Sequence, residues 1–156
     1  MDATVLVRTL FEAVPAHRTF GLTVRDAVDG CAVVELRTRP SMTNVIGSLH
    51  SSGLVALIDA AGLAAIISSA TAPEQLDGFV PLGRAASLTF RAPARGLLTA
   101  RCTLAGPTRT NLVPLFVGDT AKLRTATTTE ITDGGGTVVC LGTFDWSLRR
   151  GSLVGR

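Results

Sequence analysis

The chain has 156 residues, of which 46% are apolar and 17% charged, and its formal net charge is +3. This length and composition suit one globular domain with a real core and exclude a disordered protein. The 15 Lys and Arg residues are spread along the chain without a dense basic cluster, which argues against a nucleic-acid partner.

The first predicted elements are a short helix and a β-hairpin. Apolar residues recur at helical spacing over 3–13, and Pro15 is expected to stop this helix. Residues 20–39 alternate in part between apolar and polar side chains on both sides of Asp29-Gly30, a dipeptide typical of tight turns. We therefore expect two antiparallel strands joined at this turn.

The stretch from 44 to 70 is predicted to be a polar loop followed by one long buried helix. A single charge, Asp59, interrupts the apolar run over 53–67, and a helix that is apolar all round is normally buried. Ser51 or Ser52 is the expected N-cap. A carboxylate inside such a helix is costly to desolvate without partners, which makes Asp59 the first functional candidate.

The second half of the chain is predicted to be mainly β-structure. Segments 84–91 and 97–105 flank a turn and are expected to form one hairpin, and 122–132 and 137–148 to form another. With one long helix and about six strands, the economical α+β arrangement is an antiparallel β-sheet wrapped around one long central helix. An exposed edge of that sheet would invite pairing with a second copy.

The remaining segments set the expected domain limits. Residues 106–121 carry two prolines and an apolar cluster, and they are expected to be an insertion, namely a loop with a short helical turn. The arginine- and glycine-rich residues 149–156 are predicted to be a flexible tail. One domain is therefore expected over residues 1–148.

Cysteine usage and apolar patterning bear on the compartment. Cys31, Cys102 and Cys140 are an odd number at wide spacing, which favours free thiols over disulfides or a metal site and indicates the reducing cytoplasm. The first residues lack the pattern of a signal peptide. The apolar run over 53–67 is shorter than the roughly 20 residues that cross a bilayer comfortably, so no membrane partner is expected.

The inventory of chemical groups favours carboxylate-based catalysis. The sequence has no Walker, G-x-S-x-G, G-x-G-x-x-G or zinc-binding motif, only two histidines and no tyrosine. A helix that begins near Ser51 would point free N–H groups at the preceding loop, which is a ready oxyanion hole. Asn44 could polarise a carbonyl group or anchor the loop, and Asp59 could act as a general base or a nucleophile.

Spacing along the helix limits which copy of Asp59 can serve this site. Asp59 follows Ser51 by about 12 Å along a helix axis, whereas an attacking atom must lie about 3–3.5 Å from the reacting carbon. A second chain whose helix runs antiparallel alongside could bring its Asp59 there. We therefore predict a homodimer, or a dimer of dimers, with each site shared between two subunits.

These residues also carry a resemblance to a known family. The pattern N-x-x-G-x-x-H-x-x-G from Asn44 through Gly47 and His50, followed by Asp59 on an apolar helix, resembles the hotdog-fold acyl-CoA thioesterases. The likeness is to the phenylacetic-acid-degradation type within the 4-hydroxybenzoyl-CoA thioesterase superfamily. The later F-R-A-P-A-R-G at 90–96 is similar to a strand-end motif of that type.

The resemblance implies a dimeric hotdog fold that hydrolyses an acyl-CoA or acyl-carrier thioester, with coenzyme A as part of the substrate and no other cofactor or metal. It implies that Asn44 and the backbone N–H of Ser51 polarise the carbonyl group, and that Asp59 comes from the other subunit. Candidates for substrate binding lie in and after this motif: His50, Ser52, Gly83, Arg84 and Arg91.

Departures from the family pattern keep other interpretations open. The family usually has Gly-Gly where this chain has Ser51 and Ser52, and Gly83 stands where a strand hydroxyl often holds the water. A non-catalytic hotdog protein that binds an acyl or aromatic thioester is the alternative. A hydratase is a third hypothesis, ranked last because His50 and Asp59 would face opposite ways on one helix. Structural roles also remain open: a buried carboxylate, a turn asparagine, capping serines and solvated arginines.

Overall fold

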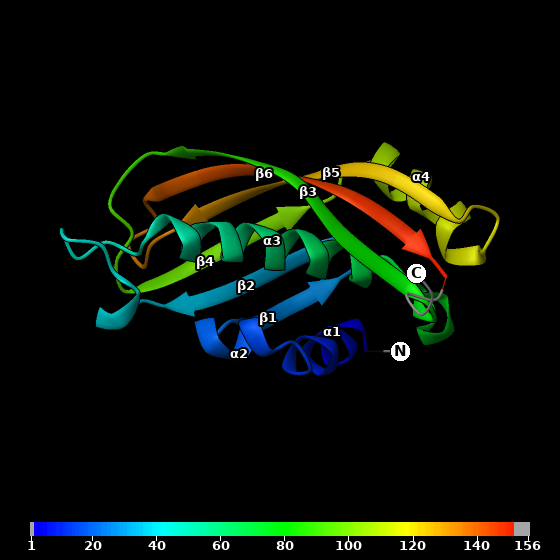
Figure 1. Ribbon diagram of the computed structural model, residues 1–156, viewed down its shortest axis with the longest axis horizontal. Coiled ribbons are helices and arrows are strands. Elements are labelled where there is room, and N and C mark those ends of the chain that lie inside the picture. The colour runs from blue at the N-terminus through cyan, green and yellow to red at the C-terminus, as the bar shows by residue number, and fades with distance from the viewer. Residues whose placement is uncertain (1, 152–156) are drawn as a thin grey trace, which may run out of the picture.

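The computed structural model describes residues 2–151 and consists of a six-stranded antiparallel sheet wrapped around a long helix (Figure 1). The strand order is β1-β2-β4-β5-β6-β3, so β1 and β3 are the sheet edges. The strands are β1 Thr23–Val28, β2 Cys31–Arg37, β3 Phe79–Phe90, β4 Leu97–Thr103, β5 Lys122–Thr132 and β6 Val138–Arg150. The helices are α1 Ala3–Glu12, α2 Pro15–Phe20, α3 Ser51–Ser68 and α4 Gly106–Val117, with 3-10 turns η1 Pro40–Met42 and η2 Pro73–Leu76.

Helix α3 is the centre of the core, as the long apolar run predicts. It is long and apolar enough to cross a bilayer, yet 67% of it is buried inside the protein. Leu57, Ile58 and Ile66 are fully buried between the helix and the sheet. Each such side chain contributes roughly 1.5–3 kcal/mol of burial free energy, so packing rather than local propensity holds this helix in place.

The close approach of α3 to the sheet requires glycine at two positions. A Cβ atom on Gly62 would lie 2.3 Å from Oγ1 of Thr127, and one on Gly142 would lie 2.1 Å from Cδ1 of Ile58. The Thr127 hydroxyl also accepts the buried indole N–H of Trp146 at 3.0 Å. A larger residue at either glycine must therefore push the helix off the sheet or break this hydrogen bond.

We expect Gly62→Ala to lower the free energy of unfolding by about 1–2 kcal/mol. Overpacking costs about 1–3 kcal/mol, and the better helix propensity of alanine, worth about 1 kcal/mol, offsets part of it. Urea unfolding followed by the fluorescence of the single tryptophan measures the change. Gly134→Ala is the matched control, because nothing lies within 4 Å of a Cβ atom there. Equal stability of the two variants would contradict the packing argument.

Two of the predicted hairpins are confirmed. Strands β1 and β2 pair across a two-residue turn in which Asp29 and Gly30 both have positive φ, 54° and 81°, as a type I′ turn requires. Strands β5 and β6 also pair. The carboxylate of Asp133 closes their connection by accepting the backbone N–H groups of Gly135 and Thr137, both at 2.9 Å.

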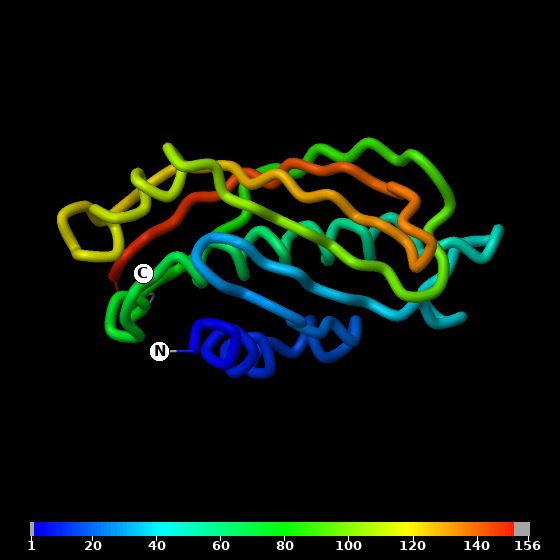
Figure 2. The backbone as a smooth tube through the Cα atoms, turned by 180° about the vertical axis from the view of Figure 1, so that it is seen from behind, coloured from blue at the N-terminus to red at the C-terminus, as the bar shows by residue number. Residues whose placement is uncertain are grey.

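The predicted hairpin of 84–91 with 97–105 is wrong. Strand β3 pairs with β6, whereas β4 lies between β2 and β5. Figure 2 shows the connecting segment arc around the end of the sheet, past the β5–β6 turn. The segment is not a tight turn because its middle is tied elsewhere: the Ala94 carbonyl accepts the Leu49 N–H at 2.8 Å.

The expectation of a loop with a short helical turn over 106–121 is also wrong, because α4 is a 12-residue helix. Pro107 lies in its first turn, where a missing N–H costs nothing, although Pro114 stands inside it. Tertiary contacts outweigh the cost of the hydrogen bond that Pro114 removes from the helix. Phe116 is buried, and the Arg150 guanidinium donates to its carbonyl at 2.7 Å, which satisfies the end of the helix.

Both chain ends differ from the predictions. Strand β6 continues through Arg150, so the first residues of the expected tail 149–156 belong to the sheet, while 152–156 lie outside the described residues. Near the N-terminus, Pro15 begins a second helix, α2, because proline suits the first helical turn. The first strand therefore begins at Thr23 and not at residue 20.

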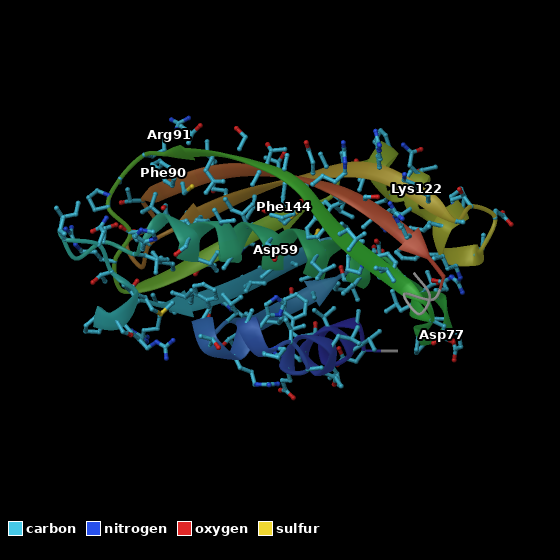
Figure 3. The ribbon with its side chains drawn as sticks, viewed as in Figure 1. Asp59, Asp77, Phe90, Arg91, Lys122 and Phe144 are labelled. Atoms are coloured by element: carbon cyan, nitrogen blue, oxygen red, sulfur yellow. The ribbon has the colours of Figure 1, made fainter. Side chains whose placement is uncertain are left out.

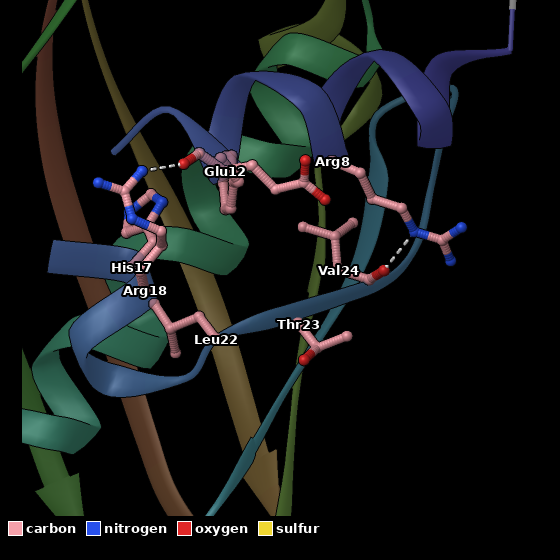
Figure 4. A pocket seen from close by; sticks show the side chains of 8 residues that line it. Arg8, Glu12, His17, Arg18, Leu22, Thr23 and Val24 are labelled. Atoms are coloured by element: carbon pink, nitrogen blue, oxygen red, sulfur yellow. Dashed lines mark hydrogen bonds between the residues drawn. The ribbon is translucent and has the colours of Figure 1, made fainter. Parts of the chain in front are cut away.

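A small cavity of about 170 Å³ lies between α1, α2 and β1 (Figure 4). His17 is buried beside it, with its ring centroid 4.4 Å from that of Phe11, and burial lowers the pKa of the imidazole. Arg8 fastens α1 to β1 by donating to the Val24 carbonyl at 2.7 Å. None of the site residues predicted from the sequence lines this cavity.

Candidate functional site

The loop before α3 fixes the orientation of the Asn44 amide. The Asn44 N–H donates to the Ser48 carbonyl at 2.8 Å, and the turn between them uses Gly47 at φ 73°. The side-chain Oδ1 of Asn44 accepts the backbone N–H groups of Ile46 and Ser48, both at 3.1 Å. Because two donors meet this atom, it is the carbonyl oxygen of the amide. The Nδ2 group is therefore left as a donor outside the loop.

The 90–96 motif holds this loop in place. The Ser48 hydroxyl accepts the Ala94 N–H at 2.8 Å, and the Ala94 carbonyl accepts the Leu49 N–H at the same distance. Arg95 donates to the Ile46 carbonyl at 2.8 Å. Sequence reasoning identified the motif by resemblance but did not assign it this role. The turn residues gave no signal that their partners lie more than 40 positions away.

His50 caps α3, so the prediction of Ser51 or Ser52 as N-cap is wrong. Its Nδ1 accepts the Ser52 N–H at 3.2 Å and lies 2.9 Å from the Ser52 hydroxyl. An imidazole nitrogen thus accepts the hydrogen bond that a side-chain oxygen usually accepts at an N-cap. Ser51 is the first helical residue, and its N–H donates to no acceptor within residues 2–151.

Asn44, His50 and Ser51 meet in one cleft of about 420 Å³ at the N-terminus of α3. We call it the Asn44 cleft. Its other walls are mostly apolar and come from the loop, the helix and the segment after β3: Ile46, Ser48, Leu54, Phe90, Ala92 and Pro93. His50 also lines a second cleft of about 450 Å³, together with Ser52 and Arg39. The predicted residue Ser52 therefore lines this second cleft and not the Asn44 cleft.

Asp59 lies midway along α3 (Figure 3). It belongs to a stripe of α3 that the sheet leaves only partly covered, together with Val55 and Leu63. The carboxylate has no hydrogen bond or ion pair within residues 2–151, and burial raises its pKa to about 6. It does not line the Asn44 cleft of its own chain. The roughly 12 Å that helical geometry puts between Asp59 and Ser51 keeps the two groups apart within one subunit.

The remaining predicted residues lie on the edge strand β3 or directly after it. Gly83 pairs with Trp146, and Arg84 is the extra residue of a β-bulge before Ala85. Arg91 follows the end of β3 (Figure 3). All three predicted residues are exposed, and none lines the Asn44 cleft within one chain. Their substrate contacts remain a prediction.

No group of three His, Cys, Asp or Glu side chains within the described range 2–151 is placed to hold a metal ion. Cys31, Cys102 and Cys140 are free thiols, as predicted. The chemical groups of the Asn44 cleft are thus an amide, a backbone N–H, an imidazole and the hydroxyls of Ser48 and Ser51, with a carboxylate farther along α3.

Solved structures share this fold. A protein of unknown function from Pseudomonas aeruginosa, named a probable thioesterase, is 24% identical, with a TM-score of 0.75 and coverage of 95% of this chain and 96% of that chain. The E. coli PaaI protein from the phenylacetic acid degradation operon is 19% identical, with a TM-score of 0.69 and coverage of 97% and 94%. A thioesterase family protein from Silicibacter pomeroyi is 18% identical, with a TM-score of 0.74 and coverage of 96% and 99%.

These likenesses confirm the predicted hotdog fold and the resemblance to PaaI and to structures named as thioesterases. No curated protein matches the sequence. One family model spans residues 3–148, nearly the whole chain. The chain therefore belongs to the family described as a domain of unknown function, DUF4442.

Proposed function

We propose that this protein hydrolyses an acyl thioester, with acyl-CoA as the substrate class, in a homodimer whose sites are shared between subunits. The main support is the meeting of two donors in one cleft, the Asn44 Nδ2 group and the Ser51 N–H, neither of which has an acceptor among the described residues 2–151. The unpartnered carboxylate of Asp59 supplies the group that a neighbouring copy would present. Structural neighbours named as thioesterases favour the same reaction class.

The two donors suit the charge that develops during thioester hydrolysis. When an oxygen attacks the carbonyl carbon, the carbonyl oxygen becomes negative, and fixed donors in a partly dry site stabilise it strongly. The N-terminus of α3 adds the positive end of its dipole. The Asn44 amide is already held by two backbone N–H groups, so it needs no reorganisation during the reaction.

Asp59 is proposed to act across the dimer. Within one chain it lies about 12 Å from Ser51 along the helix, too far to share one reacting carbon. Strand β3 is exposed over residues 82–87, and Arg84 is its single charged residue. A long edge with so few charges invites pairing with another copy. An antiparallel neighbouring α3 would then carry its own Asp59 toward Ser51.

The proposed reaction balances with these groups alone. The partner subunit's Asp59 takes a proton from water as the water oxygen attacks the carbonyl carbon. The carbonyl π electrons move to the oxygen, which accepts hydrogen bonds from Asn44 and Ser51. When the intermediate collapses, the C–S bond breaks, the thiolate takes the proton from Asp59, and the carboxylic acid leaves. A carboxylate with a pKa of about 6 suits a general base near neutral pH.

Asn44→Asp tests the donor role of Asn44 apart from its role in holding the loop. Aspartate keeps an oxygen that can accept the Ile46 and Ser48 N–H groups, but it replaces the Nδ2 donor by a charged oxygen. We expect kcat to fall by about 10²–10³-fold, with the melting temperature retained. Release of free thiol from a panel of acyl-CoA thioesters measures this. A variant that keeps the wild-type kcat would exclude Asn44 as an oxyanion donor.

The alternative is a non-catalytic hotdog protein that binds an acyl or aromatic thioester. Two observations favour it: Ser51 adds a Cβ atom at the Asn44 cleft where the related enzymes usually have glycine, and Gly83 offers no hydroxyl at its position on β3. Calorimetry of the wild-type protein with acyl-CoA thioesters distinguishes the two functions. Tight binding without thiol release would select the binding protein over the hydrolase.

The other partners follow from the same proposal. Coenzyme A enters only as part of the substrate, no metal or further cofactor is required, and neither nucleic acid nor membrane takes part in the cytoplasmic reaction. The fork of an arginine side chain suits phosphate, so Arg84 and Arg91 are the candidates for the nucleotide end of coenzyme A. Gly83 and His50 remain candidates for the rest of the substrate, whereas the Ser52 hydroxyl lies 2.9 Å from Nδ1 of the capping His50 and does not line the Asn44 cleft.

A further inference from the structure

Two adjacent serines at the start of α3 are in different chemical situations. The Ser52 hydroxyl lies 2.9 Å from Nδ1 of His50, and the Ser52 N–H donates to the same nitrogen. The Ser51 hydroxyl has no hydrogen-bond partner within residues 2–151, and Ser51 lines the Asn44 cleft. One hydroxyl therefore belongs to the helix cap, while the other is available to a ligand.

The cap leaves Ser51 as a double donor. Because the capping acceptor of His50 meets the N–H of Ser52, neither the N–H nor the hydroxyl of Ser51 has a hydrogen-bond partner within residues 2–151. The backbone nitrogen and the side chain of Ser51 are both attached to its Cα atom, so one acceptor atom in the Asn44 cleft can accept hydrogen bonds from both. A hydroxyl can rotate to donate wherever charge develops, and glycine at this position would provide the N–H alone.

Strand β3 offers no hydroxyl of its own at Gly83. A Cβ atom on Gly83 would lie 2.8 Å from Cε1 of Phe144, whose ring packs against Trp146 with centroids 4.5 Å apart. A side chain there would have to displace this aromatic pair. Two serines, Ser48 and Ser51, share the cleft with the Asn44 amide. The Ser48 hydroxyl already accepts the Ala94 N–H at 2.8 Å, so Ser51 offers the hydroxyl that has no partner within residues 2–151.

We propose that Ser51 is a catalytic residue through its side chain: its hydroxyl donates a hydrogen bond to the thioester carbonyl oxygen as that oxygen becomes negative. It is a third donor beside the Asn44 Nδ2 group and the Ser51 N–H. No proton is transferred and no bond is formed by Ser51, so the balance of the reaction is unchanged. This inference rests on the proposed thioester hydrolysis.

The test compares Ser51→Ala, Ser51→Gly and Ser51→Thr with Ser52→Ala in a thiol-release assay. The alanine and glycine variants keep the N–H but lose the hydroxyl, and we expect kcat to fall about 10²-fold with KM changed less than about twofold. Ser51→Thr restores a hydroxyl and should recover most of kcat. Ser52→Ala should instead lower the melting temperature, with a much smaller loss of kcat, because it weakens the cap.

The outcomes separate this inference from the function on which it rests. Wild-type kcat in Ser51→Ala, or an equal loss of kcat in Ser52→Ala, would overturn the role of the Ser51 hydroxyl while the hydrolase stands. A change in KM alone would also overturn it, since a donor to the developing charge acts on kcat. A wild-type protein that releases no thiol from any acyl-CoA would overturn both proposals together.

Discussion

Asp59→Asn should abolish thiol release and, at the same time, make the protein more stable at neutral pH. Loss of a general base costs about 10²–10⁴-fold in rate, so we expect kcat to fall about 10³-fold. The asparagine is isosteric but uncharged, and the carboxylate that it replaces is half-buried without a hydrogen-bond or ion-pair partner within residues 2–151. The substitution therefore removes a desolvation cost that only the function requires.

The pH dependence of this gain follows from the direction of the pKa shift. Burial raises the pKa of Asp59 from 3.8 to about 6 in the folded protein. The folded state binds more protons than the unfolded state between these values, so this group's contribution to stability falls as pH rises through that range. One pKa unit corresponds to about 1.4 kcal/mol. The advantage of Asp59→Asn should thus be small near pH 4 and reach about 2–3 kcal/mol at pH 7.5.

Urea unfolding of wild type and Asp59→Asn at both pH values, together with kcat/KM across the same range, measures the two effects. The wild-type rate should rise with pH as the carboxylate ionises around pH 6. Asp119→Asn is the matched control, since that carboxylate is exposed beyond α4 and should change neither rate nor stability appreciably. Equal stability of wild type and Asp59→Asn at pH 7.5 would contradict the argument that burial of the Asp59 carboxylate costs stability.

The features that the sequence predicts correctly are local ones. The helix over 51–68 follows from an apolar run in which Asp59 is the single charge, and the first hairpin follows from Asp29-Gly30, which needs positive φ at both positions. Asn44 and Ser51 are near neighbours in the chain, so a loop and a helix start suffice to bring them to one cleft.

The features that the sequence misses depend on distant partners. Strand β3 joins β6 across more than 50 residues, and no pattern inside β3 specifies that choice. Helix α4 forms despite Pro114 because Phe116 is buried and Arg150 binds its carbonyl group. Propensity favours a serine cap, yet His50 takes that role through its contact with Ser52. For β3 and α4 a tertiary contact outweighs a local preference, whereas the His50 cap is a contact between near neighbours in the chain.

A heterodimer of Asn44→Asp with Asp59→Asn should recover activity that neither homodimer has. In a shared site, the intact Asn44 of one chain meets the intact Asp59 of the other, while the second site carries both substitutions. Two chains with different affinity tags, co-expressed and purified on both tags in turn, give this species alone. We expect roughly half the wild-type kcat per dimer, because one of two symmetric sites is intact. The homodimers of each variant should remain about 10²-fold or more below it.

The reciprocal heterodimer tests whether the site is instead formed by residues of a single chain. A wild-type chain paired with a chain that carries both substitutions has a damaged residue in each shared site, so it should be inactive. If Asn44 and Asp59 of one chain formed the site together, the reciprocal heterodimer would instead keep half of the wild-type kcat. The first heterodimer would then be inactive. The expected order rests on the roughly 12 Å of helix between Ser51 and Asp59, a separation that no side-chain rotation in a single subunit can close. Only a neighbouring subunit that supplies the carboxylate makes the first heterodimer active and the second inactive.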